Sequence, residues 1–462
     1  MAHSLFSPEL MLMLDEQDDA GLAAFCENLH PATIAEALAE SLTVEQAWRV
    51  LSHTGIRQQA AVFEYLPPET QVAMVDGAGR EHMARLIERM SHDDRADLLR
   101  RLSPTVAEGL LRLVDEADRR DIATLAGYRE NIVGALMTTD YAWLPANLTA
   151  VEAVERLRQM APDRETIYYI YILDESTRKL LGILSLRDLI LASKAAKLVD
   201  LMDREVISVR ADQDPETAAR VLAQYDLLAV PVIDGDGRLV GIVTHDDAID
   251  VVVQAATEDL QRQAAVGPMT DNYLEGNFFT VWRKRAFWLA ALFIAEMATF
   301  NAMAYFDEAM KAITVLALFV PLCISTGGNS GSQAATLITR ALALGQITPR
   351  NWLRVLRHEL LMGLVLGLTL GIIAFARARL FTPQHVLENP GGSHTDLWRL
   401  TLVVSQAVMA ICLWGTLVGS TLPMIFKRLG VDPGIASSPF VATFVDVTGI
   451  VIYFTIASIV VL

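Results

Sequence analysis

The last 24 residues, Pro439–Leu462, read PFVATFVDVTGIVIYFTIASIVVL, and all but a few of them are apolar or small. A run of this length can cross a bilayer as a helix, because a span needs about 20 apolar residues. Asp446 lies near the middle, where an ionised carboxylate that faced lipid would cost roughly 2.5–3.5 kcal/mol or more. We therefore expect Asp446 to face an aqueous path or a partner group.

Four further apolar runs precede this stretch and predict an α-helical membrane protein with five transmembrane helices. They are roughly Ala286–Tyr305, Ala312–Leu337, Leu360–Phe375 and Leu400–Phe426, the third being the shortest. With the N-terminus inside, nine Lys and Arg residues flank the inner ends of the spans and four flank the outer ends, which favours a cytoplasmic N-terminal part and a C-terminus outside. An odd number of spans has no internal two-fold symmetry, so an ion path is more natural on a homodimer axis.

Polar residues in these runs predict where such a path lies. Glu296 is the other acid that lies well away from the ends of its run. The second run contains STGGNSGSQAAT, Ser325–Thr336, whose glycines fit either an unwound segment that lines a cavity or close packing of small residues. Asn329 and Gln333 favour the cavity, because packing does not require them.

The charge balance separates this part from the rest of the chain. From Thr280 onward there are 8 acids and 13 bases, a net of +5, which leaves 47 acids and 25 bases before it, a net of −22. A nucleic-acid partner is unfavourable, since phosphates require basic surfaces. Metal cations are a natural counter-charge, although solubility alone also explains an acidic composition.

Two kinds of repeat fill the acidic part. From Leu29 a phrase recurs with openings at 29, 42, 66, 90 and 102, each an apolar residue followed by a helix-capping or first-turn residue. This spacing predicts short helices stacked into a superhelix. Next, two units that start at Leu136 and Leu201 each read as helix, strand, tight turn, strand and helix.

The first of these units carries a signature of Gly182, Ser185 and Asp188, which the second repeats as Gly241, Thr244 and Asp247. On this signature the two units resemble a tandem pair of CBS domains, named for cystathionine β-synthase. In that family the hydroxyl and acid often bind adenine nucleotides, so the resemblance implies Ser185, Asp188, Thr244 and Asp247 as nucleotide contacts and ATP as a ligand. A helix cap made by the same residues is the competing interpretation.

Two further stretches are distinctive together: PLCISTGGNSGSQAATLITRAL in the second run and DPGIASSPFVATFVDVTGIVIYF before the C-terminus. With the order of the repeats, they carry a resemblance of the whole chain to the MgtE family of magnesium channels. It implies a helical superhelix at 1–130, a CBS pair at 131–253, a connecting helix at 254–280 and a pore domain at 281–462. It also implies a homodimeric, Mg2+-selective uptake channel in the cell (inner) membrane, which cytosolic Mg2+ closes.

We expect the pore to involve Asp446, Ala442, Asn329, Glu296 and Gln333. Mg2+ sheds water reluctantly and usually binds one or two carboxylates with much of its hydration shell retained. Intracellular Mg2+ would bridge acids of the cytosolic part; the positions that fit are Asp94, Asp97, Asp214, Glu216, Asp226, Asp247, Asp250, Glu258 and Asp259.

Three other functions compete with this one. The spans could merely anchor a nucleotide-sensing CBS pair, or the transported ion could be Co2+ or Mn2+, against which the lack of His and Cys ligands argues. An enzyme is least expected, because the sequence has no nucleophile or phosphate-loop motif. The scattered histidines are interpreted as surface or helix-cap residues: His30, His53, His82, His92 and His358.

Overall fold

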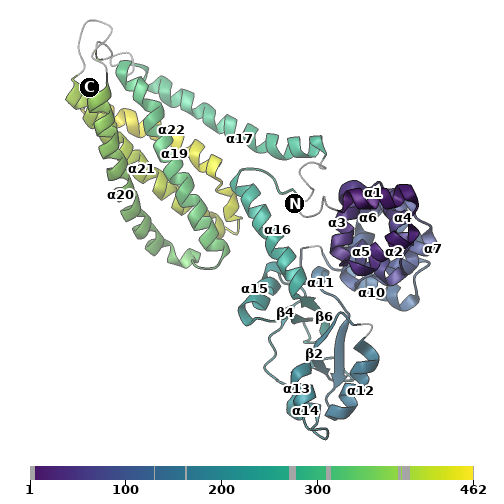
Figure 1. Ribbon diagram of the computed structural model, residues 1–462. Helices are drawn as coiled ribbons and strands as arrows, with labels where there is room; N and C mark the ends of the chain where they lie inside the picture. The colour runs from purple at the N-terminus through teal and green to yellow at the C-terminus, as the bar shows by residue number, and fades with distance from the viewer. Residues whose placement is uncertain are drawn as a thin grey trace. The chain divides into compact units, whose positions relative to one another are not determined.

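The computed structural model describes residues 6–129, 131–161, 164–269, 277–308, 314–382, 387 and 396–460. It separates into two compact units, Met1–Val253 and Gln254–Leu462. Figure 1 shows the first unit in purple to teal and the second in teal to yellow.

Short helices wound into a superhelix open the first unit (Figure 1). Alternate helices pack on one another, α3 on α5 and α4 on α6, around a core that includes Leu22, Phe63 and Met74. The helices are α1 (Ser7–Glu16), α2 (Asp19–Asn28), α3 (Pro31–Ser41), α4 (Val44–Ser52), α5 (Ile56–Glu64), α6 (Pro68–Gly77), α7 (Arg80–Ile87), α8 (His92–Arg101), α9 (Pro104–Leu111) and α10 (Glu116–Ala126). The predicted superhelix is confirmed, and the five expected openings each precede a helix by two residues.

Two three-stranded sheets follow, each flanked by helices. The strands are β1 (Tyr141–Pro145), β2 (Thr166–Leu173) and β3 (Leu180–Ser185), then β4 (Val209–Arg210), β5 (Ala229–Ile233) and β6 (Leu239–Thr244). In each sheet the first strand is parallel to the second, and the second is antiparallel to the third. Each of the two sequence repeats therefore contains its predicted pair of strands. Each also contains a short first strand that the sequence pattern did not indicate.

Helices complete this CBS pair. They are α11 (Val133–Leu136), α12 (Ala150–Met160), α13 (Leu186–Leu191), α14 (Leu198–Leu201), α15 (Pro215–Tyr225) and α16 (His245–Gln263). Asp234 forms the predicted tight turn between β5 and β6, where its Oδ1 accepts the backbone N–H groups of Asp236 and Arg238 at 2.9 Å. Gly237 has φ +79° in this turn, a conformation that favours glycine.

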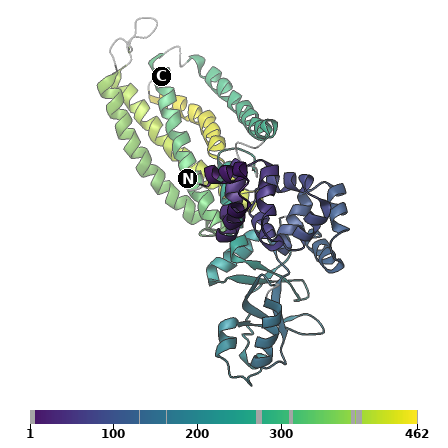
Figure 2. The ribbon, with the colours of Figure 1, turned by 45° about the vertical axis from the view of Figure 1, so that its right-hand side comes forward.

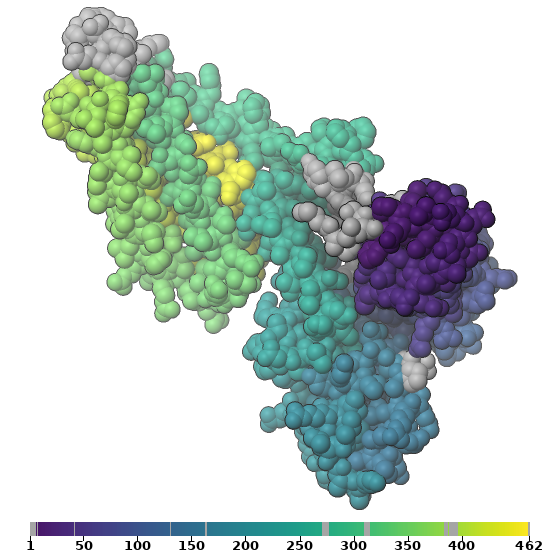
Figure 3. Space-filling view, viewed as in Figure 1, coloured from purple at the N-terminus to yellow at the C-terminus, as the bar shows by residue number. Residues whose placement is uncertain are grey.

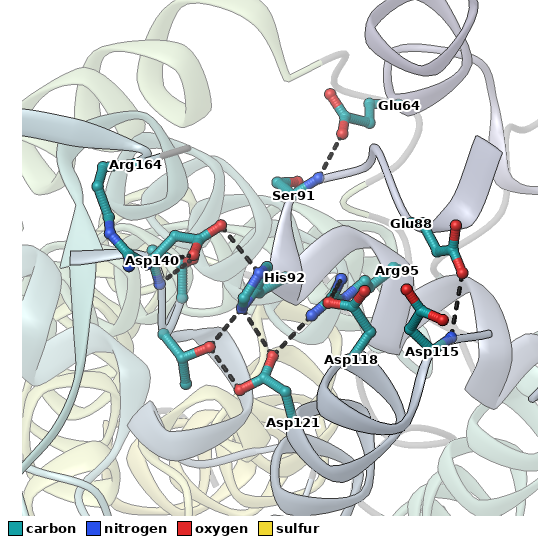
Figure 4. Close-up of polar contacts among 12 residues, drawn as sticks. Glu64, Glu88, Ser91, His92, Arg95, Asp115, Asp118, Asp121, Asp140 and Arg164 are labelled. Carbon is teal, nitrogen blue, oxygen red and sulfur yellow. Dashed lines mark hydrogen bonds and ion pairs between the residues drawn. The ribbon is translucent and has the colours of Figure 1, made fainter. Parts of the chain in front are cut away.

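A polar network at the start of α8 joins the superhelix to the CBS pair (Figure 4). His92 lies 2.6 Å through Nδ1 from Asp121 and 2.9 Å through Nε2 from Asp140, which precedes β1. Burial lowers the pKa of His92, but hydrogen bonds with Asp121 and Asp140 outweigh it and raise the pKa overall. The interpretation of His92 as a surface or cap residue is therefore wrong, because a single sequence does not reveal carboxylates that are distant along the chain.

Arg95 belongs to the same network and pairs with two of its carboxylates. Its side chain is 1% exposed and pairs with Asp118 at 3.0 Å and with Asp121 at 2.9 Å. Burial raises the pKa of Asp121, yet hydrogen bonds from His92 and Thr139, the charge of His92 and a hydrogen bond from Arg95 bring it down to about 2. A buried guanidinium with two carboxylates is costly to break, so this contact fixes α8 on α10.

Among its described residues, the second unit holds five helices that are long and apolar enough to cross a membrane. They are α17 (Phe278–Tyr305), α19 (Thr314–Ala343), α20 (Trp352–Phe381), α21 (Leu397–Arg428) and α22 (Ser438–Val460). The number of spans agrees with the prediction, and the third is longer than its apolar run because it continues past charged residues at both ends. Figures 1 and 2 both show α19, α20, α21 and α22 as a bundle, and on the face in Figure 3 α22 (yellow) emerges only in small patches.

Glycines bring α19 and α21 into backbone contact. A Cβ atom on Gly415 would lie 2.2 Å from the Gly327 oxygen, and one on Gly419 would lie 2.0 Å from the Gly331 oxygen. Helix α19 runs without interruption through Ser325–Thr336. The expectation of an unwound segment there is therefore wrong; the glycines serve close packing, and the helix keeps its own backbone hydrogen bonds.

Candidate ion-binding sites

A cavity of about 520 Å³ lies between α17, α19 and α22, and Asp446 is one of the residues that line it. Helix α17 contributes Glu296 and Thr299, and α22 contributes Ala442 one turn before Asp446. Helix α19 contributes Ser325, Gly328, Asn329 and Ser332, whose spacing of i, i+3, i+4 and i+7 places them on one helix face.

The absence of a side chain at Gly328 opens the wall beside the acid. A Cβ atom built there would lie 3.6 Å from Asp446 Oδ1 and 3.5 Å from Ala442 Cβ. The Asp446 side chain is half-buried, so its carboxylate can meet water or an ion in the cavity. Glu296 accepts a hydrogen bond from the Thr299 hydroxyl at 2.9 Å, which orients the second acid of the site.

Four of the five residues expected in the pore line this one cavity: Asp446, Ala442, Asn329 and Glu296. Gln333 is exposed and is not among the lining residues. Sequence reasoning missed the hydroxyls of Ser325 and Ser332, although their spacing from Asn329 was a signal that could have identified them. The cavity thus offers carboxylate, amide and hydroxyl oxygens, the ligands that Mg2+ prefers.

A second acidic site forms within the first unit, where three segments meet. Glu64 ends α5, Asp93 and Asp94 begin α8, and Asp247 begins α16. Glu64 accepts the Ser91 backbone N–H at 2.6 Å (Figure 4), and the Ser91 hydroxyl donates to Asp94 at 2.9 Å.

Burial and mutual repulsion both raise the pKa values of these acids. Burial, and then the charges of Asp94 and Glu165, raise the pKa of Glu64 to about 7 despite the Ser91 hydrogen bond. Burial also raises the pKa of Asp93, to which Asp247 adds the largest neighbouring charge. Such a cluster has excess negative charge that a cation would neutralise. Sequence reasoning found Asp94 and Asp247 but missed Glu64, Asp93 and Glu165, which nothing in their local sequence distinguishes.

The other expected regulatory acids have contacts or positions of their own, and, besides burial, the charge of Asp97 also helps to raise the pKa of Asp94 in this cluster. Asp214 caps α15 by accepting the Glu216 N–H at 2.9 Å, and Asp226 ends the same helix with φ 51°. Asp97 pairs with Arg100 at 2.8 Å, and Asp250 is exposed on α16. Among the described residues, no three His, Cys, Asp or Glu side chains are placed to hold a metal ion together.

The end of α16 carries the remaining two acids and lies in the second unit. Glu258 pairs with Arg262 at 3.2 Å, and Arg262 also pairs with Asp432 in the loop between α21 and α22. Burial raises the pKa of neighbouring Asp259, opposed by the charge of Arg262. Asp432, which sequence reasoning did not single out, therefore fixes α16 against this loop through an arginine.

The expected nucleotide contacts make helix caps in the structure. The Ser185 hydroxyl accepts the Asp188 N–H at 3.0 Å and donates to the Asp188 carboxylate at 2.6 Å. The Thr244 hydroxyl donates to Asp247 at 2.5 Å. The capping interpretation accounts for these contacts, and Asp247 belongs to the acidic cluster as well.

Family models match most of the chain in three parts. Residues 29–131 match the MgtE intracellular N domain, 133–195 and 198–254 match the CBS domain, and 320–456 match the MgtE divalent cation transporter model.

Curated relatives extend over nearly the full length. The magnesium transporter MgtE of Thermus thermophilus is 38% identical over 447 residues, 96% of each chain. The magnesium transporter MgtE of Bacillus subtilis is 30% identical over 449 residues, 97% of this chain and 96% of its own. A solved structure of the cytosolic domain of the Mg2+ channel MgtE in complex with ATP is 38% identical, covers 53% of this chain and 99% of that chain, and superposes with a TM-score of 0.51. With this similarity along almost its entire length, the chain belongs to the MgtE family of magnesium transporters.

Proposed function

We propose that this chain is a Mg2+-selective channel for magnesium uptake, with Asp446 as the principal pore ligand. The observation that carries the proposal is the cavity between the apolar helices α17, α19 and α22, where Asp446, Glu296 and Asn329 meet. Acids at this depth are costly against lipid, so a cation path accounts for both of them.

The chemistry of the cavity suits a hydrated ion. Its volume of about 520 Å³ accommodates Mg2+ with several waters, and its walls supply few charged ligands. Few ligands favour conduction, because an ion must leave as readily as it enters. The ion would move down its electrochemical gradient.

A homodimer would place a second copy of Asp446 across the path. An apolar groove of about 410 Å³ between α15 and α16 supports dimerisation, with Leu228, Ile249 and Val252 about half exposed. Exposed apolar surface of this kind is typical of protein interfaces. Basic residues near the ends of the spans support an N-terminal part in the cytoplasm and a C-terminus outside, in the cell (inner) membrane.

Uptake of Mg2+ into proteoliposomes that hold a fluorescent Mg2+ indicator tests the pore assignment. Asp446→Asn keeps the size of the side chain and removes its charge, so it should abolish most of the flux. Gln333→Ala, outside the cavity on the same helix as Asn329, is the matched control and should conduct normally. Equal flux through Asp446→Asn and the wild type would refute the role of Asp446.

The same vesicles test the alternative of broader selectivity. Competition by Co2+ or Mn2+ at equal concentration should inhibit Mg2+ uptake weakly if the ion keeps its water shell. Strong inhibition would favour the broader divalent cation transporter.

Closure by cytosolic Mg2+ is the regulatory part of the proposal, and the cluster of Glu64, Asp93, Asp94 and Asp247 supports it. Ions shared between few carboxylates complete their coordination with water, and several weak sites act together. The acids on α15 and at the end of α16 remain candidates for further shared sites.

Limited proteolysis of the full chain tests this closure. Millimolar Mg2+ should protect α16 and the segment that follows it, and Asp247→Asn should raise the Mg2+ concentration needed. Asp236→Asn, an exposed turn acid, should behave as wild type. Protection that is indifferent to Mg2+ would remove the gating model.

ATP binding to the CBS pair is a second candidate function. A cavity of about 700 Å³ beside Ser185 is lined by Arg187, Tyr168 and Tyr169, a charge for phosphate and rings for a base. Isothermal titration with ATP and the Arg187→Ala variant tests it. A purely anchored nucleotide sensor would bind ATP and conduct no Mg2+ in the vesicles.

A further inference from the structure

A groove of about 280 Å³ lies between the start of α20 and the end of α21, away from the ion cavity. Trp352, Val355 and Leu356 line it from α20, three and four residues apart on one helix face. Thr421, Met424, Ile425 and Arg428 line it from α21 with the same spacing, and Pro349 closes the end.

The walls of the groove are apolar over most of their length. The Thr421 hydroxyl donates to the Leu417 oxygen at 2.7 Å within its own helix, so it offers no free donor to the groove. Trp352 is 50% exposed and Ile425 is 49% exposed, which leaves the groove open along its side. The segment from Thr421 to Arg428 spans roughly 10 Å of helix, which suits a hydrocarbon chain.

Positive charge gathers at one end of this groove. Arg428 is the one charged lining residue, and Arg350, Arg354 and Arg357 are exposed nearby on α20 and the turn before it. Among the described residues, none of these four arginines makes an ion pair. Arginine binds phosphate with two parallel hydrogen bonds, so the end of the groove is complementary to a phosphate group.

The groove also lies at the depth where a lipid headgroup meets its chains. Both helices are membrane spans, and Arg428 and Trp352 stand at their ends, where basic and aromatic residues favour the interface. Arg262 of α16 pairs with Asp432, four residues beyond Arg428, so this is the end of the bundle at which α16 lies. In the proposed topology it is the cytoplasmic end.

From the apolar walls and the unpaired arginines we infer a binding site for an anionic phospholipid of the cytoplasmic leaflet. One acyl chain lies along Trp352, Leu356 and Ile425, and the phosphate lies on Arg428. Basic pockets between transmembrane helices on this side are a recognised way of holding anionic lipids.

Native mass spectrometry of the purified full chain tests the site with phosphatidylglycerol and phosphatidylcholine of the same acyl chains. The wild type should retain phosphatidylglycerol preferentially, and Arg428→Ala should bind it about tenfold more weakly, as loss of a charge-assisted hydrogen bond implies. Arg399→Ala, an exposed arginine at the opposite end of α21, is the matched control and should bind normally.

Two further arms keep the inference falsifiable. Arg428→Lys keeps the charge and should retain part of the affinity for phosphatidylglycerol. It is the variant to use if Arg428→Ala does not fold. Phosphatidylglycerol with brominated chains should quench less fluorescence in Trp352→Phe than in wild type. Equal binding by Arg428→Ala and wild type, equal retention of phosphatidylcholine, or displacement by millimolar inorganic phosphate would overturn the lipid assignment. Lipid binding is measured without ion flux, so it fails or succeeds independently of the proposed channel.

Discussion

Replacing Gly419 by alanine should separate α19 from α21. The added Cβ would lie 2.0 Å from the Gly331 oxygen, a backbone atom that no rotamer change can move away. To reach 3.0 Å, below which such contacts are essentially never seen, the helices must part by about 1.0 Å. Overpacking of this kind costs roughly 1–3 kcal/mol.

Gly449→Ala provides the matched control for this cost. Its Cβ would lie 3.4 Å from Cγ2 of Ile411, an ordinary distance to a side chain that can adjust. Both substitutions make the same chemical change inside a membrane helix, so the intrinsic preference of alanine for helix cancels in the comparison. Gly419→Ala should therefore be less stable than Gly449→Ala by the clash alone.

Unfolding of the full chain in mixed micelles with increasing sodium dodecyl sulfate, followed by tryptophan fluorescence, measures this difference. Gly419→Ala should unfold at less detergent than Gly449→Ala, and its Mg2+ flux should fall because α19 carries Asn329. Equal unfolding midpoints for the two variants would refute the backbone contact between α19 and α21.

Three other perturbations test the remaining contacts. Arg95→Ala leaves two carboxylates without their buried partner, so native-state hydrogen exchange should show the opening free energy of α8 lowered by about 3–5 kcal/mol. The control Arg120→Ala removes one partner of an exposed ion pair and should cost less than about 1 kcal/mol. Equal losses in the two variants would contradict the argument from burial. Glu64, with its pKa raised to about 7, is neutral below that pH and charged above it, so the proteolytic protection that Mg2+ adds should shrink from about pH 8 to about pH 6; a constant effect would exclude a role for this acid. Arg262→Asp should release the end of α16 to proteases and Arg262→Asp with Asp432→Arg should restore protection, whereas no change in either variant would mean that the pair does not hold α16.

Local patterns predicted five helices of the superhelix, those that follow the recurring openings at 29, 42, 66, 90 and 102. Two residues after each opening a helix begins: α3, α4, α6, α8 and α9. The pattern did not predict α5 and α7. They follow Gly55 and Gly79, which make no side-chain cap. Both fall in the gaps of the same spacing of about 12 residues, so the repeat was stronger evidence than any single cap.

The candidate sites were predictable only in part, because they depend on contacts between distant segments. Asp446 and Glu296 stood out, since an acid in an apolar run is conspicuous by itself. Glu64 and Asp93 are ordinary acids on amphipathic helices, and only the fold brings them to Asp247. The glycines of α19 were compatible with an unwound segment or with close helix packing. The glycines of α21 decide for packing, because Gly415 and Gly419 lie directly against the backbone of α19.

The backbone contact between α19 and α21 has a mechanical consequence. No layer of side chains lies between the two helices at Gly327 and Gly415, so there is nothing between them to compress or re-pack. A displacement of the loop that holds Asp432 must therefore travel along α21 and carry α19 with it. The two helices should therefore move as one rigid body, with the partner of Arg262 in the loop that follows α21 and Asn329 on the face of α19 that lines the cavity with Asp446.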